Sequence, residues 1–134
     1  MNLLGVEHIG IVVADLDAAV KRLEDVLGVK CRSRENLEAG GLEMAIFQIG
    51  EVKVEILSPT REGTAVSKFL AERGGGIHHV CFKVQDIKGC LEELDKKGVG
   101  LIDKVPREGA SGHKIAFINP KSVLNVLMEL CESK

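Results

Sequence analysis

Two histidines and two glutamates hold equivalent places in two halves of the chain. His8 and His79 each open an apolar stretch that ends in valine and is followed by aspartate and an aliphatic residue. Glu55 and Glu129 each stand between aliphatic residues later in their half. Imidazole nitrogens and carboxylate oxygens bind divalent first-row metals. The four residues are therefore predicted to bind one metal ion, Co, Mn, Ni or Zn, and to leave room for a substrate.

The glutamates strengthen the prediction of a metal site. Strand alternation places Glu55 on one face with Lys53 and Leu57. Glu129 stands in an otherwise apolar run, Val126–Leu130. A carboxylate in such a run loses hydration, which costs several kcal/mol unless a cation or hydrogen bonds compensate.

The spacing of the repeat indicates a duplicated unit. His8 and His79 are 71 positions apart, and so are Asp15 and Asp86, which are of the type that caps a helix. We expect one helix from Asp15 to a stop at Gly28 and its twin from Asp86 to a stop at Gly98.

Short strands are expected after each helix. The expected strands are 29–33, 42–49 and 52–57 in the first half and 100–103, 114–118 and 124–131 in the second. Gly50-Glu51 is a tight-turn signal between two of them. A short amphipathic helix is expected over 65–73, before the glycines 74–76 release the chain into the second half.

This order predicts an α+β fold of two tandem βαβββ modules that form a curved mixed sheet around the metal site. Module one covers about 1–58, a linker helix segment about 59–75, and module two about 76–134. The halves are small, so we expect one pseudo-symmetric domain over 1–134.

Composition excludes several classes of function. The chain has 134 residues, 45% of them hydrophobic and 28% charged, with a net charge of −2. This balance gives no reason to expect nucleic acid or an anionic membrane as partner. There is no signal peptide pattern and no apolar run near membrane-spanning length, so a cytoplasmic protein is expected.

The four cysteines show no CxxC spacing. Cys81 and Cys131 stand in apolar, strand-like runs, and in a reducing compartment we expect buried small hydrophobic residues rather than disulfides or ligands.

Six segments along the chain carry a family likeness: Glu7–Ile11, Ser58–Pro59, Gly75–Phe82, Gly112–Phe117, Asn119–Ser122 and Val126–Leu130. On these segments the whole chain resembles the vicinal oxygen chelate superfamily, and within it is most similar to the methylmalonyl-CoA epimerases. The resemblance implies His8, Glu55, His79 and Glu129 as metal ligands. Alternation points His78 to the opposite face.

The resemblance also implies a reaction, the interconversion of (2R)- and (2S)-methylmalonyl-CoA. Removal of the C2 proton would give an enolate stabilised by the metal, and two carboxylates would move protons on the two faces of C2. The resemblance suggests Glu43 as one acid–base residue and Glu129 as the second.

Contacts to the acyl-CoA substrate are expected from Lys114, Lys121 and Ser122, and a homodimer is usual in the family. The chain departs from the family pattern at Asn119, where a histidine is common, and at Asn125, where a glycine is common. Both departures fall where the substrate contacts are expected.

Two other functions remain open at this point. Bacterial-type glyoxalase I enzymes, which act on a glutathione hemithioacetal, share the ligand set, so the ligands alone do not choose the reaction. Non-catalytic proteins of this fold bind small molecules, although such proteins commonly lack the ligands. The sequence also leaves open a related substrate such as ethylmalonyl-CoA.

Overall fold

The computed structural model describes residues 1–133, which divide into two compact units. The first unit is His8–His78, and the second unit is Met1–Glu7 together with the residues from His79 onward. The helices are α1 (Leu16–Leu27), α2 (Ala65–Arg73) and α3 (Ile87–Lys96). The strands are β1 (Leu3–Val12), β2 (Ser33–Leu37), β3 (Leu42–Ile49), β4 (Val52–Pro59), β5 (Gly76–Val84), β6 (Arg107–Glu108), β7 (Lys114–Ile118) and β8 (Leu127–Glu132).

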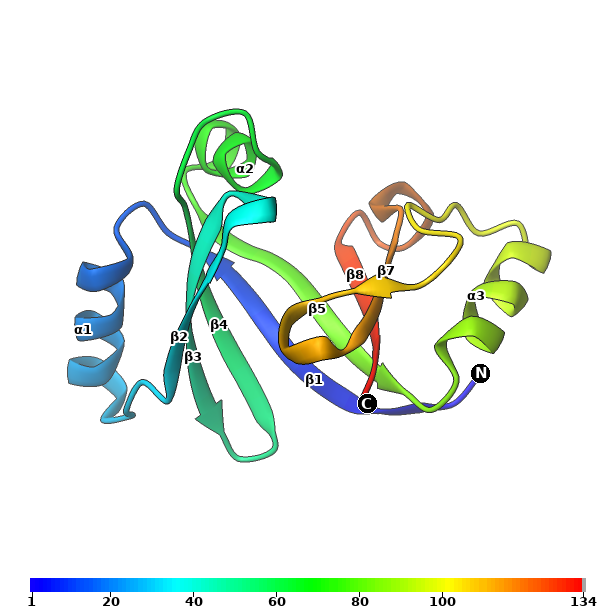
Figure 1. Cartoon of the computed structure of the whole chain (residues 1–134), viewed down its shortest axis with the longest axis horizontal. Helices are drawn as coiled ribbons and strands as arrows, with labels where there is room; N and C mark the ends of the chain where they lie inside the picture. Colours follow the sequence, from blue (N-terminus) through cyan, green and yellow to red (C-terminus); the bar gives the residue numbers. More distant parts are fainter. Residues whose placement is uncertain (134) are drawn as a thin grey trace. The chain divides into compact units, whose positions relative to one another are not determined.

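The two halves have the same topology, which confirms the predicted α+β fold of two βαβββ modules. In the first unit the strand order is β2-β3-β4-β1, with β1 and β4 parallel and the other pairs antiparallel. In the second unit the order is β5-β8-β7-β6, with β5 and β8 parallel. β1 and β5 each begin in one unit and end in the other (Figure 1). The predicted division into modules within one domain stays a prediction.

Helices α1 and α3 begin at the predicted aspartates. The carboxylate of Asp15 accepts a hydrogen bond from the backbone N–H of Ala18, and that of Asp86 accepts one from Gly89, both at 3.1 Å. Each bond satisfies one of the free donors at a helix start. Gly28 ends α1 in the left-handed region, at φ 69°. No described helix is long and apolar enough to span a membrane.

In each unit one helix packs against one face of the sheet. Leu16 and Val20 of α1 pack on Ala45, Phe47 and Ile56 in the first unit. In the second unit, α3 packs on a set made of Val84, Ala116, Ile118 and Leu130. We call these the helix faces. The opposite faces, which carry His8 and Glu55 in the first unit and His79 and Glu129 in the second, are the site faces.

Three of the predicted strands are wrong in position. Residues 29–33 connect α1 to β2, which starts only at Ser33. Residues 100–103 form a single bridge, between Leu101 and Ile118, and the strand paired with β7 is β6. β8 begins at Leu127, because Leu124 and Asn125 have φ of 50° and 61° and cannot continue a strand.

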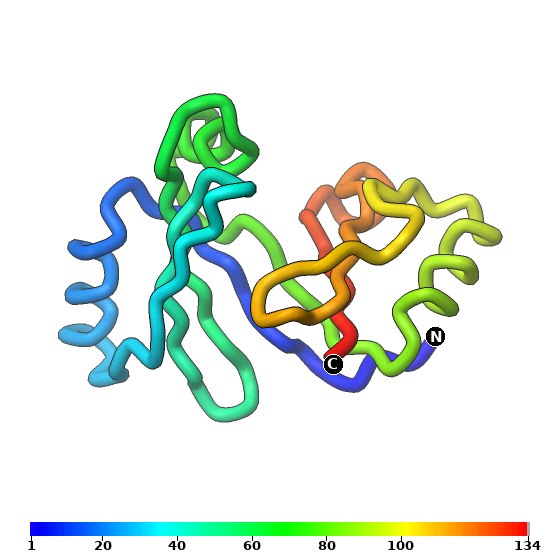
Figure 2. The backbone as a smooth tube through the Cα atoms, viewed as in Figure 1, coloured from blue at the N-terminus to red at the C-terminus, as the bar shows by residue number. Residues whose placement is uncertain are grey.

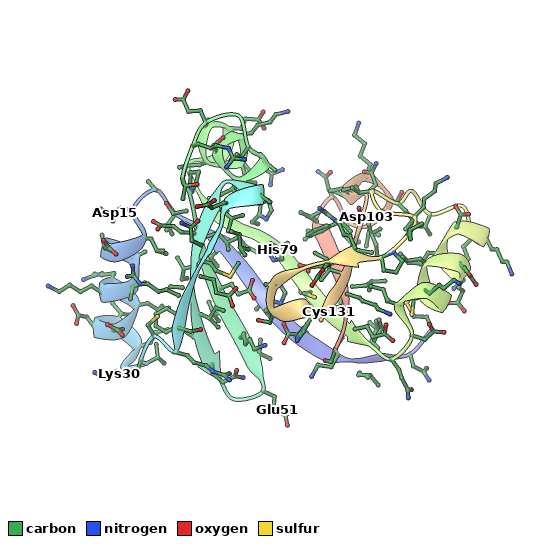
Figure 3. The ribbon with its side chains drawn as sticks, viewed as in Figure 1. Asp15, Lys30, Glu51, His79, Asp103 and Cys131 are labelled. Carbon is green, nitrogen blue, oxygen red and sulfur yellow. The ribbon has the colours of Figure 1, made fainter. Side chains whose placement is uncertain are left out.

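Strands β3 and β7 and helix α2 have the predicted bounds. The chain path in Figure 2 turns tightly from β3 into β4, where Ile49 pairs with Val52 across Gly50 and Glu51. Glu51 points away from the strands at the tip of this turn (Figure 3). The two-residue turn fixes the register of the whole hairpin.

Candidate metal and catalytic site

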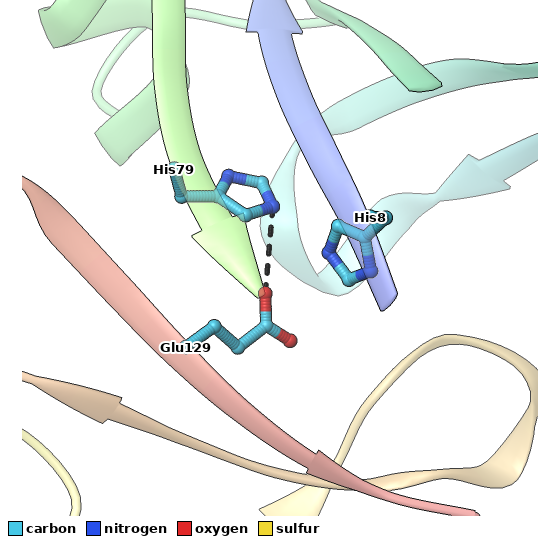
Figure 4. A group of neighbouring side chains, drawn as sticks. All are labelled: His8, His79 and Glu129. Carbon is cyan, nitrogen blue, oxygen red and sulfur yellow. Dashed lines mark ion pairs between the residues drawn. The ribbon is translucent and has the colours of Figure 1, made fainter. Parts of the chain in front are cut away.

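Each unit holds one buried histidine–glutamate pair. In the first unit, Nε2 of His8 lies 3.5 Å from Oε1 of Glu55. In the second unit, Nε2 of His79 lies 3.4 Å from Oε1 of Glu129 (Figure 4). All four residues are at most 7% exposed. The sequence therefore identified four residues that the fold buries in two matching pairs.

The strand register explains why the pairs match. His8 pairs with Lys53 on the parallel strand β4, and Gly10 pairs with Glu55, so His8 and Glu55 are diagonal neighbours on one face. The second unit repeats this arrangement on β5 and β8, where Cys81 pairs with Glu129. The duplication seen in the sequence is thus a duplication of side-chain geometry.

The donor set and spacing of each pair fit a divalent cation. Metal–nitrogen and metal–oxygen bonds are about 2.0–2.2 Å, which puts two ligands of one tetrahedral ion roughly 3.4 Å apart. The observed separations of 3.5 and 3.4 Å agree with this value. Burying a carboxylate costs free energy that a cation would offset.

Aromatic contacts surround His79 of the second pair. The ring of His79 meets that of Phe117 edge to face, with centroids 6.2 Å apart. The guanidinium of Arg107 lies 5.2 Å from the centroid of the Phe117 ring and 3.2 Å from a carboxylate oxygen of Asp103. Phe117 pairs with Glu129 and Arg107 pairs with Ile115, so both lie on the site face. Arg107 was not among the predicted site residues, because no sequence motif singles it out.

Glu43 does not share a face with Glu55. Glu43 pairs with Ser58 on β4, whereas Glu55 pairs with Ile46. Because side chains alternate along a strand, Glu43 lies on the helix face with Ala45 and Phe47. The charge of Glu43 acts there on Arg34, which also pairs with Asp17 of α1 at 2.6 Å. The predicted acid–base role of Glu43 stays a prediction, and the register gives it no support.

The three predicted substrate contacts have different surroundings in the structure. Lys114 pairs with Glu132 and lies on the helix face, opposite Glu129. The hydroxyl of Ser122 accepts a hydrogen bond from the backbone N–H of Gly100 at 2.9 Å. Lys121 is exposed in the turn Pro120–Ser122 that precedes β8. Of the three, Ser122 is the one whose side chain makes a hydrogen bond within the fold.

Two cysteines lie next to the second pair along its strands. Cys81 and Cys131 are buried, as expected, and they are diagonal neighbours on the site face. Interaction with Cys131, together with burial, raises the pKa of Cys81. Interaction with Cys81 and with His113, whose Nδ1 lies 3.5 Å from the Cys131 sulfur, lowers the pKa of Cys131.

Buried Glu7, only 7% exposed, is another residue that the sequence analysis did not single out. Its signal was a charged side chain inside the apolar strand that carries His8.

Comparison with known proteins places the chain in a family. The model of the Glyoxalase/Bleomycin resistance protein/Dioxygenase superfamily matches residues 7–117. The chain is 41% identical to the uncharacterized protein YqjC of Bacillus subtilis, over 96% of this chain and 91% of that protein. It is 31% identical to the ethylmalonyl-CoA/methylmalonyl-CoA epimerase of Cereibacter sphaeroides, over 92% of this chain and 93% of that enzyme.

A solved structure shows the same fold. The solved structure of methylmalonyl-CoA epimerase in complex with methylmalonyl-CoA and NH4+ is 36% identical to this chain and superposes with a TM-score of 0.93. The match covers 98% of this chain and 96% of that one.

Proposed function

Because this chain belongs to the Glyoxalase/Bleomycin resistance protein/Dioxygenase superfamily, we propose that it is a metal-dependent epimerase of (2R)- and (2S)-methylmalonyl-CoA. The observation that carries the proposal is that each unit holds a buried His–Glu pair with matching geometry. Relatives named as methylmalonyl-CoA epimerases, similar over nearly the full length of the chain, support the substrate. The name of one relative also includes ethylmalonyl-CoA, which extends the proposed substrate range to that acyl-CoA.

We propose that His8, Glu55, His79 and Glu129 bind one divalent ion of the Co, Mn, Ni or Zn kind. When bound, such an ion supplies positive charge for the oxygen atoms of a substrate that gains negative charge as its C2 proton leaves. The matching geometry of the two pairs and the sequence repeat support this assignment.

The chain's own residues divide the remaining tasks. Glu129 lies on the site face and is the proposed proton-transfer carboxylate of the second unit. The Phe117 ring contacts the ring of His79 edge to face and also contacts the guanidinium of Arg107. Arg107 is therefore a cation on the site face, and its guanidinium is suited to bind the anionic groups of an acyl-CoA. Lys121 remains a proposed contact. The register favours Arg107 over Lys114 because Lys114 lies on the helix face.

We further propose that the enzyme is cytoplasmic and works as a homodimer. The exposed Leu3 and Leu4 at the start of β1, 52% and 58% exposed, support an apolar contact between copies. Sedimentation of the metal-loaded protein at micromolar concentration measures the mass directly.

The reaction is tested by deuterium exchange. Metal-loaded protein is incubated with (2R)-methylmalonyl-CoA in D₂O, and deuterium at C2 is followed by NMR together with formation of the (2S) form. An epimerase exchanges C2 and produces both stereoisomers. In parallel, methylglyoxal and glutathione test for glyoxalase I. Formation of lactoylglutathione without C2 exchange would replace the proposal by that activity, and absence of both reactions would favour a binding protein.

A further inference from the structure

Asp103 lies in the second unit, on the segment that connects α3 to β6 (Figure 3). Its side chain is only 16% exposed, although the residues that follow it, 104 and 105, are exposed. A carboxylate that loses this much hydration requires hydrogen bonds or a cation in exchange. The surroundings of Asp103 supply both.

The carboxylate of Asp103 binds two groups. Its Oδ2 accepts a hydrogen bond from the backbone N–H of Phe117 at 2.9 Å, and the backbone N–H of Asp103 in turn donates to the carbonyl oxygen of Phe117 at 3.2 Å. The same carboxylate pairs with Arg107, whose Nε lies 3.2 Å from Oδ1 and 3.3 Å from Oδ2. Asp103 therefore joins the backbone of β7 to the guanidinium of Arg107.

The first unit satisfies the equivalent backbone differently. Ile46 and Phe117 are counterparts, because each pairs with the buried glutamate of its unit. In the first unit, β2 runs alongside β3 as far as Ile46. In the second unit, β6 pairs only with residues 114–115, so Phe117 lies beyond it and uses Asp103 as its acceptor. This backbone requirement does not explain the ion pair with Arg107.

The ion pair orders a side chain that is otherwise exposed. The side chain of Arg107 is 55% exposed, and an arginine in water samples many rotamers. Its Nε is held by Asp103, and its guanidinium lies 5.2 Å from the centroid of the Phe117 ring, which also contacts His79. Because Nε makes the hydrogen bond to Asp103, the two terminal nitrogens remain as donors for a ligand.

We propose that Asp103 is a positioning residue for the acyl-CoA substrate, which acts by holding the guanidinium of Arg107 in one direction on the site face. This role rests on the proposed function, in which Arg107 binds an anionic group of the substrate. A guanidinium that is already ordered loses less conformational entropy when it binds a phosphate or a carboxylate. The negative charge of Asp103 acts in the opposite direction, because it repels an anion. At about 0.5 M salt the Debye length is roughly 4 Å, so this repulsion is screened while the ordering persists.

The ion pair is tested by NMR, without reference to activity. In spectra of the ¹⁵N-labelled full-length protein, the Nε–H signal of Arg107 is the one that Arg107→Gln removes. A hydrogen bond to a carboxylate slows exchange of that proton with water. We expect Asp103→Asn to speed the exchange at least several-fold, whereas Asp95→Asn, which alters an exposed carboxylate of α3, leaves it unchanged. Equal exchange rates in the parent and in Asp103→Asn would overturn the proposal.

The consequence for the substrate is tested by KM and kcat of the metal-loaded enzyme in 0.5 M salt. Asp103→Asn keeps an oxygen acceptor for the N–H of Phe117 and removes the charge that holds Arg107. We expect KM for methylmalonyl-CoA to rise about two- to tenfold with a smaller change in kcat, and Asp95→Asn to match the parent. In an Arg107→Gln background, Asp103→Asn is expected to change KM no further, because Asp103 acts through Arg107. An equal rise in both backgrounds, as a purely structural role would give, or a fall of KM, would overturn the proposal.

Two further measurements keep the test decisive. If Asp103→Asn fails to fold, Arg107→Lys tests the same contact, because lysine keeps the charge but has no Nε; a parental KM in that variant would overturn the proposal. If the parent shows no C2 exchange, the same proteins are titrated with propionyl-CoA by calorimetry, and the dissociation constant replaces KM. Weaker binding by Asp103→Asn alone then supports the positioning role although the proposed reaction has failed. A parent that binds no propionyl-CoA would overturn both.

Discussion

Glu43 and Glu55 lie on opposite faces of the β3–β4 hairpin. Glu55 faces the same side as His8, whereas Glu43 lies beside Arg34 on the side covered by α1. Lys114 holds the corresponding position in the second unit and also lies on the helix face. The two residues that distinguish the copies at this position therefore both point away from the ligand pairs of their own units.

The first prediction concerns the proton-transfer residue. We expect Glu43→Gln to keep C2 deuterium exchange within about tenfold of the parent, because its carboxylate is on the helix face. Glu129→Gln is expected to lose at least about 10²-fold, the usual minimum for an acid–base residue. Exchange rates are measured by NMR with the metal content of each protein determined alongside. A hundredfold loss in Glu43→Gln at full metal occupancy would restore Glu43 as an acid–base residue.

The second prediction concerns the metal ligands. Glu55→Gln is expected to reduce the bound metal and to remove the thermal stabilisation that added Co²⁺ gives the parent. A ligand at 100 times its dissociation constant stabilises by about 2.7 kcal/mol, which a melting curve detects readily. Glu51→Gln is the matched control, since Glu51 is exposed in the turn before β4. Equal stabilisation of Glu55→Gln and Glu51→Gln by the metal would exclude Glu55 as a ligand.

The third prediction concerns which face of the second unit binds the substrate. Arg107→Gln removes a cation on the site face and is expected to raise KM for the acyl-CoA several-fold with a smaller change in kcat. Lys114→Gln removes a cation on the helix face and is expected to change KM less. Initial rates over a range of substrate concentrations measure both. A larger KM effect at Lys114 would assign the contact that the sequence predicts and remove the one assigned to Arg107.

The fourth prediction concerns the entry into β5. Gly75 has φ 105°, and a Cβ placed there would lie 2.8 Å from the backbone oxygen of Val12. Gly74 has φ 73° and open space around its Cβ position. We expect Gly75→Ala to lower the free energy of unfolding by more than Gly74→Ala, with a difference of at least about 1 kcal/mol. Urea unfolding curves of both variants measure it, and equal losses would mean that the loop moves away from Val12 at no cost.

The fifth prediction concerns Ser122. Its hydroxyl accepts a hydrogen bond from the N–H of Gly100, so Ser122→Ala is expected to cost about 1 kcal/mol of stability and to leave KM unchanged. Thermal unfolding and initial rates of the same preparation test both statements. A raised KM with parental stability would make Ser122 a substrate contact.

Much of the fold could be read from the chain because its signals are local. Asp15 and Asp86 have the capping chemistry that starts a helix, and Gly28 has the conformational freedom that ends one. The constant spacing of the repeat then predicted two equal modules. Residues 29–33 and 100–103 misled the strand prediction because β-type residues form a strand only where a partner strand lies alongside.

The sequence by itself determined that a histidine and a glutamate occur at equivalent positions in each copy, since residue type and spacing belong to the chain alone. The faces on which other residues lie were decided by strand pairing. The turn at Gly50-Glu51 pairs Glu43 with Ser58, and a change of one residue in the register would have moved Glu43 to the side of Glu55. Cys81 and Cys131 are 50 positions apart in the chain, and only the parallel pairing of β5 and β8 makes them diagonal neighbours on one face.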